Sequence, residues 1–256
     1  MSQEEIHDLL AYDGVKIIQR KDLFRFSLDS LLLGDFVKIN PRANMIVDFG
    51  TGLGPIPLYL SMKTKKPIIG IDIQEEALIL AKKSVELNHL DDQISFKHID
   101  INNILDVFDP SSIDIITINP PFFKYHNDEF VNKLDSFTIS RHEVLIDLEG
   151  IIKSARKIIS NGGTINMVHR ANRLEEIFLL LNQYNFKVKR IRFVYTKSDK
   201  EAMMILIEAR FNGKPGDLKI EQPLVIYDEN NDYTKEVLNI FHLGDETYET
   251  KFQLSK

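Results

Sequence analysis

The stretch MIVDFGTGLG, residues 45–54, joins an apolar run to three alternating glycines. The apolar run predicts a buried strand that ends at Asp48, followed by a turn and a short helix. Glycine allows tight turns and close approach of the backbone to a ligand. Between a strand and a helix, such glycines predict a cofactor-binding bend. The residues assigned to it are Gly50, Thr51, Gly52 and Gly54.

The glycine spacing narrows the kind of cofactor. It is G-x-G-x-G, whereas dinucleotide-binding folds use G-x-G-x-x-G, and no Lys-Ser/Thr follows as in a phosphate-binding loop. The Asp48 carboxylate, two residues before the first glycine, would repel a pyrophosphate, but it suits an ammonium group. A nicotinamide-dependent oxidoreductase is therefore disfavoured.

Strands and helices alternate along most of the chain. This alternation predicts an α/β fold with a doubly wound, mostly parallel sheet covered by helices on both faces. The last two of seven expected strands have no helix between them, so we expect them to pair antiparallel. The expected strands are residues 45–48, 67–72, 94–98, 113–118, 164–168, 188–195 and 202–210. The expected core helices are residues 56–62, 75–88, 148–159 and 173–184.

Two further acidic residues follow the second and third core strands. Asp72 stands where Rossmann-type folds place the acid that binds ribose hydroxyls, and Asp100 could bind an adenine amine. Ile73 and Ile101, which come next in the chain, are included as predicted cofactor contacts. A cofactor with an ammonium, a ribose diol and an adenine but no phosphate is S-adenosylmethionine, whose product is S-adenosylhomocysteine.

The segment Asn119-Pro120-Pro121-Phe122 ends the fourth core strand, at the edge where open α/β sheets bind ligands. Two prolines stiffen the segment and remove two backbone donors. The carbonyls of Asn119 and Pro120 and the Asn119 side chain can then accept hydrogen bonds from a substrate NH2 group. Phe122 can stack on a flat substrate. These four residues are the predicted catalytic residues, acting by positioning and electrostatics.

Taken together, these motifs resemble class I methyltransferases that act on planar amine or amide nitrogen. The resemblance covers roughly residues 15–210, and that class includes adenine methyltransferases and release factor glutamine methyltransferases. It implies a Rossmann-like, doubly wound, mostly parallel seven-stranded sheet with an antiparallel edge strand. It also implies that Asn119 contacts the cofactor as well as the substrate.

Three more segments resemble the bacterial valine-tRNA adenine-N6 methyltransferases, which modify the adenine beside the anticodon. They are residues 24–33, Arg141-His142-Glu143, and Tyr227 with the later residues 233–236. The resemblance implies transfer of a methyl group from S-adenosylmethionine to the N6 amine of an adenine in tRNA(Val), with tRNA as the partner. It also implies that Asp29 lines the methionine end of the cofactor. Phe122 stands where many members carry tyrosine, so stacking is retained without a hydroxyl.

Composition excludes several other classes. The chain has 256 residues, no cysteine and a net charge of -6. The absence of cysteine excludes disulfides and thiolate chemistry, and the seven histidines show no metal-ligand spacing, so no metal is predicted. No signal peptide and no apolar run of roughly 20 residues are present, which predicts a cytoplasmic protein without a membrane partner. No stable protein partner is predicted either.

The acidic net charge counts against binding RNA phosphates over a broad surface. RNA would therefore have to bind at local basic patches, such as the one made by Lys187, Lys189, Arg190 and Arg192.

We expect one methyltransferase domain over residues 1–256: a strand and helix extension over 1–40, the cofactor-binding core over 41–210, and a C-terminal extension over 211–256. Residues 1–14 are expected to be weakly helical.

Two alternatives stay open. One is a glutamine methyltransferase acting on a release factor, although such enzymes usually carry an N-terminal helical domain and only about 40 residues precede the core here. The other is a non-catalytic S-adenosylmethionine-binding sensor.

Overall fold

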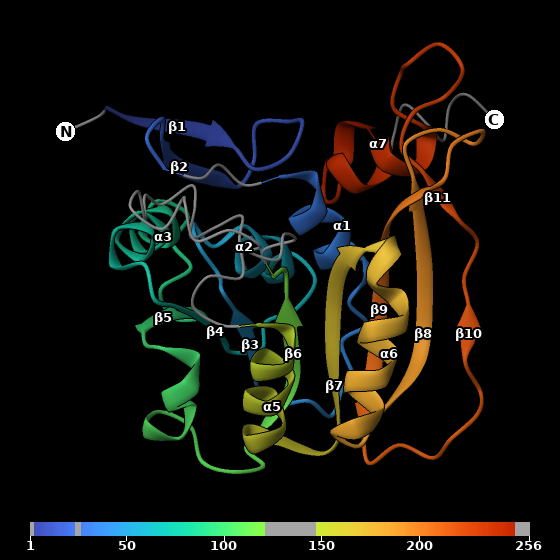
Figure 1. The fold of residues 1–256 in the computed structure, drawn as a ribbon. Helices are drawn as coiled ribbons and strands as arrows, with labels where there is room; N and C mark the ends of the chain where they lie inside the picture. The colour runs from blue at the N-terminus through green and yellow to red at the C-terminus, as the bar shows by residue number, and fades with distance from the viewer. Residues whose placement is uncertain (1–2, 24–26, 121–146, 249–256) are drawn as a thin grey trace, which may run out of the picture.

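The structure is a computed structural model that describes residues 3–23, 27–120 and 147–248. Within these residues a mixed sheet of nine strands forms the centre of the molecule (Figure 1). Its strands are β3 (Ile46–Phe49), β4 (Ile68–Asp72), β5 (Ile94–His98), β6 (Ile113–Ile118), β7 (Ile159–Arg170), β8 (Phe186–Tyr195), β9 (Ala202–Phe211), β10 (Lys219–Ile220) and β11 (Leu224–Val225). Their order is β10-β8-β9-β7-β6-β3-β4-β5, and β11 also pairs with β8.

The strands β3 to β7 are parallel to one another. All seven strands expected from the sequence are present. The predicted antiparallel pair is also present, since β9 runs antiparallel to β8. The position of the antiparallel strand differs from the expectation, because β9 lies between β7 and β8 rather than at the edge. Residues 204–207 of β9 are all buried, so both faces of this strand are covered, as suits an interior strand. β8 therefore lies outside β9, and the two-residue strands β10 and β11 pair with the outer side of β8.

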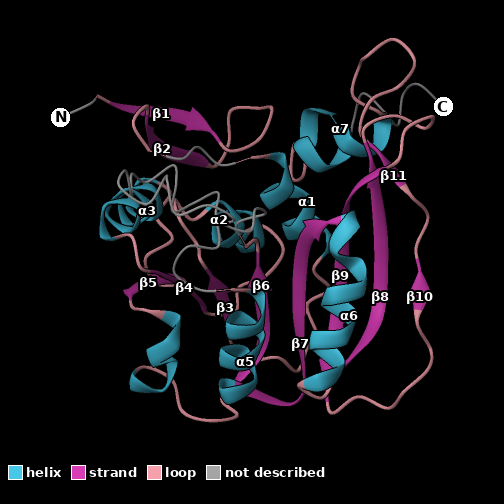
Figure 2. Ribbon diagram, viewed as in Figure 1, coloured by secondary structure: helices cyan, strands magenta, loops and turns pink. Residues whose placement is uncertain are grey.

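Helices cover both faces of the sheet (Figure 2), as the doubly wound prediction requires. One hydrophobic cluster contains side chains of α1 (Leu28–Phe36), α2 (Pro55–Ser61), α3 (Glu75–Leu87) and α7 (Lys235–Phe241). A second cluster contains side chains of the 3-10 helix η1 (Ile101–Asp106), α5 (Leu148–Ile158) and α6 (Leu174–Gln183), which follows the short η3 (Ala171–Arg173). The two clusters therefore form two cores separated by the sheet.

The N-terminal segment forms a β-hairpin of β1 (Glu4–Asp8) and β2 (Lys16–Arg20). The weak helix expected over residues 1–14 is wrong for this part of the chain. The side chains of β1 alternate between half-buried and exposed, and its partner β2 carries the fully buried Ile17. Pairing with an apolar strand outweighs the weak helical preference of a polar segment. The strand expected within the extension over residues 1–40 is present as β2.

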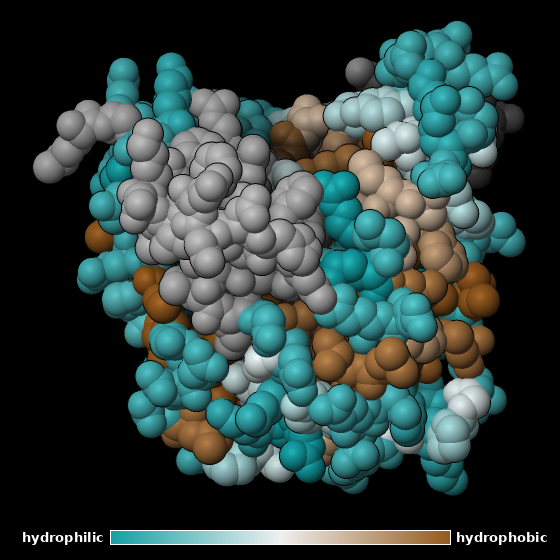
Figure 3. Space-filling model, viewed as in Figure 1, coloured by the Kyte–Doolittle hydropathy of each residue, from teal (hydrophilic) through white to brown (hydrophobic). Residues whose placement is uncertain are grey.

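Hydrophobic and hydrophilic residues are interspersed over the described part of the face that carries α5 and α6 (Figure 3). Among the described residues, none of the helices combines the length and the hydropathy that crossing a bilayer requires.

Ser84 connects the N-terminal hairpin to the core. Its Oγ accepts a hydrogen bond from the Ile18 backbone N–H and donates to the Leu80 carbonyl, each at 2.9 Å, and its side chain is fully buried. The serine in α3 thus satisfies a buried donor of β2 that lies 66 positions earlier in the chain.

Replacing Ser84 by alanine leaves the buried Ile18 N–H without this acceptor. We expect Ser84→Ala to lower the free energy of unfolding by about 1–3 kcal/mol, measured by urea denaturation. Lys82→Ala, on the exposed side of the same helix, is the control and should change it by less than about 0.5 kcal/mol. Equal stability of Ser84→Ala and wild type would show that the hairpin does not depend on this contact.

Candidate functional site

The carboxyl ends of β3 and β6 meet at one edge of the sheet. Their parallel register pairs Asp48 with Thr117 and Phe49 with Ile118. The next residue on each strand is Gly50 on one side and Asn119 on the other. The glycine bend and the Asn-Pro corner are therefore neighbours, as the sequence-based prediction of a shared site requires.

Three glycines of the bend adopt left-handed backbone conformations, with φ of +67° at Gly50, +52° at Gly52 and +79° at Gly54. L-residues with a side chain rarely occupy this region, so the sequence pattern has a direct conformational cause. Apart from its chain neighbours, a Cβ atom added at Gly50 or Gly52 would meet no atom of the described residues within 4 Å. Within the described part of the chain, the backbone of the bend can therefore be approached closely by a ligand.

Asp48 is a buried carboxyl beneath the bend, 1% exposed. Its Oδ1 accepts a hydrogen bond of 2.6 Å from the Thr117 hydroxyl. Its Oδ2 and the Thr51 hydroxyl oxygen are buried without a hydrogen-bond partner among the described residues. Burial raises the pKa of Asp48 to about 7, although the hydrogen bond from Thr117 and the nearby Thr51 hydroxyl oppose the shift. A cationic or hydrogen-bond-donating ligand at this carboxyl would favour its ionised form.

Asp72 ends β4 and connects it to the bend. Its Oδ2 accepts a hydrogen bond from Gly52 N at 2.7 Å, and its Oδ1 accepts one from Gln74 N at 2.9 Å. Burial raises the pKa of this carboxyl, while the backbone donors act in the opposite direction. A carboxylate has about four lone-pair positions, so Asp72 can accept further hydrogen bonds from ligand hydroxyls.

Ile73 directly follows Asp72 at the end of β4, and Asp100 and Ile101 follow the neighbouring strand β5. The register of β4 and β5 pairs Asp72 with His98, which places Asp100 two residues beyond the edge. Asp100 caps η1, because its Oδ1 accepts a hydrogen bond of 2.8 Å from Asn102 N. Ile73 is 39% exposed, and Ile101 is half-buried against the second hydrophobic cluster. All three therefore belong to the same edge as the bend.

Asn119 is half-buried at the end of β6, and Pro120 after it is buried. The Asn119 Nδ2 donates a hydrogen bond of 3.0 Å to the hydroxyl oxygen of Ser30 in α1. This contact uses one end of the amide and leaves Oδ1 as the remaining acceptor. Pro121, Phe122, Arg141 and His142 lie outside the described residues.

Asp29 occupies the first turn of α1, and Ser27 precedes the helix without a side-chain capping hydrogen bond. Burial raises the pKa of the Asp29 carboxyl. A hydrogen bond from Ser27 and the positive charge of Arg170 partly offset this shift. Asp29 is adjacent in sequence to Ser30, which contacts Asn119, so α1 brings it to the same site.

Sequence reasoning missed Ser30 and Thr117 as members of the site. Thr117 could have been recognised as a site residue from the sequence, because it is a hydroxyl residue in the otherwise apolar end of a core strand. Ser30 gave no signal of this kind, since serine near a helix start is common. Among the described residues, no group of three or more His, Asp or Glu side chains is placed to hold a metal ion.

Several known proteins are similar to this chain in sequence. A protein of Phocaeicola vulgatus named tRNA1(Val) (adenine(37)-N6)-methyltransferase is 25% identical over 204 residues, covering 78% of this chain and 84% of the relative. A release factor glutamine methyltransferase of Aliivibrio fischeri is 27% identical over 159 residues, covering 58% of this chain and 53% of the relative.

A solved structure of a predicted O-methyltransferase from Agrobacterium tumefaciens matches the fold with a TM-score of 0.64 at 18% identity. It covers 84% of this chain and 96% of that one. This likeness supports the class I Rossmann-like fold. The family model described as the methyltransferase small domain matches residues 28–193, which is more than half of the chain. The chain therefore belongs to the methyltransferase small domain family.

Proposed function

We propose that this chain transfers a methyl group from S-adenosylmethionine to the exocyclic N6 amine of an adenine in tRNA, the adenine beside the anticodon of the valine tRNA. The observation that carries the proposal is the register of β3 and β6, because it makes the glycine bend and Asn119 neighbours at one sheet edge. Family membership supports methyl transfer. The name of the Phocaeicola vulgatus relative supports adenine in tRNA as the substrate.

The residues at the bend fit S-adenosylmethionine. The lack of nearby atoms beside Gly50 and Gly52, among the described residues, allows a ligand against the backbone, and Asp72 can accept further hydrogen bonds from a ribose diol. The Oδ2 of Asp48, which has no partner among the described residues, suits the ammonium group, and we assign Asp29 to the methionine end of the cofactor. When bound, the cofactor supplies an electrophilic methyl group on a sulfonium sulfur.

Other contacts are proposed from the same edge. The Asp100 carboxylate is proposed to accept a hydrogen bond from the adenine amine of the cofactor. The remaining proposed cofactor contacts, through side chain or backbone, are Thr51, Gly54, Ile73, Ile101 and Asn119.

Asn119 and Pro120 orient the substrate amine. The lone pair of an adenine amine is delocalised into the ring, so the amine is a poor nucleophile. Acceptors around its two hydrogens, namely Asn119 Oδ1 and the carbonyls of the corner, favour a pyramidal nitrogen with its lone pair directed outward. No strong base is required, since the methylated amine cation loses its proton readily to water. We also assign Pro121 to rigidity of the corner and Phe122 to stacking on the base.

An unpaired or flipped-out adenine suits a site at a sheet edge. Because the chain carries a net charge of -6, local basic patches rather than an overall positive field have to bind the phosphates. A tRNA substrate also favours a cytoplasmic location, and we propose that residues 1–256 act as one catalytic domain.

The competing substrate is the glutamine side chain of a release factor, whose amide nitrogen is also planar. The Aliivibrio fischeri relative supports this reading less well, because the match covers only 53% of that protein. A non-catalytic sensor would bind S-adenosylmethionine without transferring its methyl group.

A transfer assay with methyl-labelled cofactor separates these readings. We expect label in a valine tRNA transcript, recovered by mass spectrometry as N6-methyladenosine, and none in a transcript whose adenine beside the anticodon is replaced by guanosine. Label in release factor but not in tRNA would favour the glutamine substrate. Cofactor binding without transfer to either would favour the sensor.

Removing the Asn119 side chain tests its assigned role. We expect Asn119→Ala to lower the rate constant for transfer by about 10²-fold or more, the scale for loss of a polar group that acts in the transition state. Cofactor affinity, measured by calorimetry, should change by less than about threefold. Asn182→Ala, at an exposed position of α6, is the matched control and should behave as wild type. Turnover of Asn119→Ala equal to wild type would refute the role.

The raised pKa of Asp48 predicts a proton linkage. At pH 6 the Asp48 carboxyl, with a pKa of about 7, is mostly protonated in the free protein. An ammonium at Oδ2 favours the carboxylate, so cofactor binding releases this proton and strengthens as pH rises toward 7.

Calorimetry at pH 6 in buffers of different protonation enthalpy should count about one proton fewer released by Asp48→Asn than by wild type. An equal count in the two proteins would mean that Asp48 does not face the cation.

A further inference from the structure

Ser30 and Asn119 belong to segments 89 positions apart, yet their side chains meet at the site. Ser30 lies in the first turn of α1 and is only 5% exposed. Its hydroxyl oxygen accepts the hydrogen bond from Asn119 Nδ2 at 3.0 Å. A buried serine contact on the amide of a proposed catalytic residue restricts how that amide can turn.

The two ends of an asparagine amide are chemically opposite, since Oδ1 accepts hydrogen bonds and Nδ2 donates them. A substrate NH2 group needs an acceptor. If the Asn119 amide turned over, Nδ2 would face the substrate amine, and two donors would oppose each other. The Ser30 hydroxyl can donate or accept, but in the structure it accepts from Nδ2, and this arrangement leaves Oδ1 directed away from Ser30.

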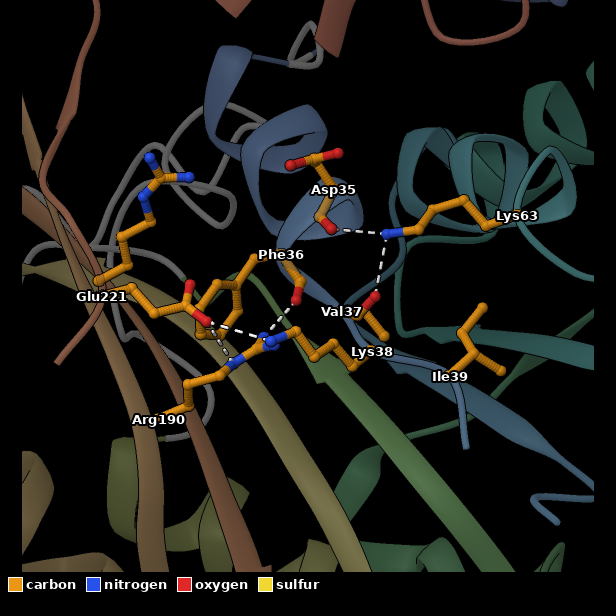
Figure 4. A pocket seen from close by; sticks show the side chains of 9 residues that line it. Asp35, Phe36, Val37, Lys38, Ile39, Lys63, Arg190 and Glu221 are labelled. Atoms are coloured by element: carbon orange, nitrogen blue, oxygen red, sulfur yellow. Dashed lines mark hydrogen bonds and ion pairs between the residues drawn. The ribbon is translucent and has the colours of Figure 1, made fainter. Parts of the chain in front are cut away.

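The C-terminal end of α1 is held firmly, so Ser30 has a fixed base. Lys63 Nζ donates hydrogen bonds to the carbonyls of Gly34, Asp35 and Val37 at 2.5–2.9 Å. Arg190 donates to the carbonyl of Phe36 and stacks on its ring at 3.9 Å (Figure 4). Cations at a helix C-terminus also interact favourably with the helix dipole. α1 is therefore attached at one end to the turn after α2 and to β8, while its first turn contacts Asn119.

We propose that Ser30 is a positioning residue that orients the Asn119 amide so that Oδ1 accepts from the substrate amine. This inference rests on the proposed function for its substrate, but the orienting contact itself applies to any planar NH2 substrate. Ser30 acts through Asn119 and touches neither the methyl donor nor the reacting nitrogen.

The first test compares full-length wild type, Ser30→Ala, Ser30→Thr and Ser61→Ala in single-turnover transfer to valine tRNA. Ser61 is the matched control, because it is also a buried helical serine, 4% exposed, whose hydroxyl donates within its own helix. We expect Ser30→Ala to slow transfer about 10- to 100-fold, the effect of a misplaced reacting group. Affinities for cofactor and tRNA should stay within about threefold of wild type.

Threonine keeps the hydroxyl, so Ser30→Thr should recover most of the rate, and Ser61→Ala should stay within about twofold of wild type. In an Asn119→Ala background, Ser30→Ala should change the rate by less than about twofold, because residues that act as a unit are not additive. A wild-type rate in Ser30→Ala, or an equal loss in the Asn119→Ala background, would overturn the proposal.

A second readout needs no activity. The side-chain amide resonances of Asn119, identified in 15N-asparagine-labelled protein by their loss in Asn119→Ala, should shift in Ser30→Ala and stay in place in Ser61→Ala. Unmoved resonances in Ser30→Ala would overturn the orienting role even if threonine is not accommodated at this position. If wild type does not methylate tRNA but the resonances shift, the tRNA assignment fails and the Ser30 contact stands.

Discussion

The parallel pairing of β3 with β6 is the constraint on which the site depends. Parallel strands end at the same edge, so residues that follow paired positions must lie side by side. In this chain those residues are Gly50 and Asn119. The bend can carry a ligand only because glycine accepts left-handed backbone, and the corner can present acceptors only because β6 stops there. A shift of one residue in this register would turn the paired side chains to the opposite face.

The site departs from the rules that the rest of the fold obeys. The two cores are apolar and well buried, whereas the edge combines left-handed backbone with carboxyls in positions that raise their pKa. Asp72 is compensated by two backbone donors, but one oxygen of Asp48 has no partner among the described residues. Such local conflicts gather where a protein is shaped for a ligand. The proposed cofactor would satisfy them with its ammonium and hydroxyl groups.

Much of the fold was predictable because its signals are local. Apolar runs bounded by turn residues located all seven core strands, and the lack of a helix before residues 202–210 indicated the antiparallel pair. The glycine spacing and the acids after the strands located the proposed cofactor contacts. The insertion of β9 between β7 and β8 was not predictable, because the lateral order of strands depends on which faces the finished sheet buries. The N-terminal hairpin was missed for a similar reason, since β1 is stabilised by its partner strand.

The sequence by itself determined the α/β class, the glycine bend, the Asn-Pro corner and the resemblance to nitrogen methyltransferases, because each is written in contiguous residues with local conformational preferences. The tertiary structure alone decided that Thr117 bonds Asp48, that Gly52 bonds Asp72 and that Ser30 bonds Asn119. These contacts join residues 20 to 89 positions apart. No local pattern encodes them, since their geometry exists only after the strands have paired and α1 has packed against the sheet.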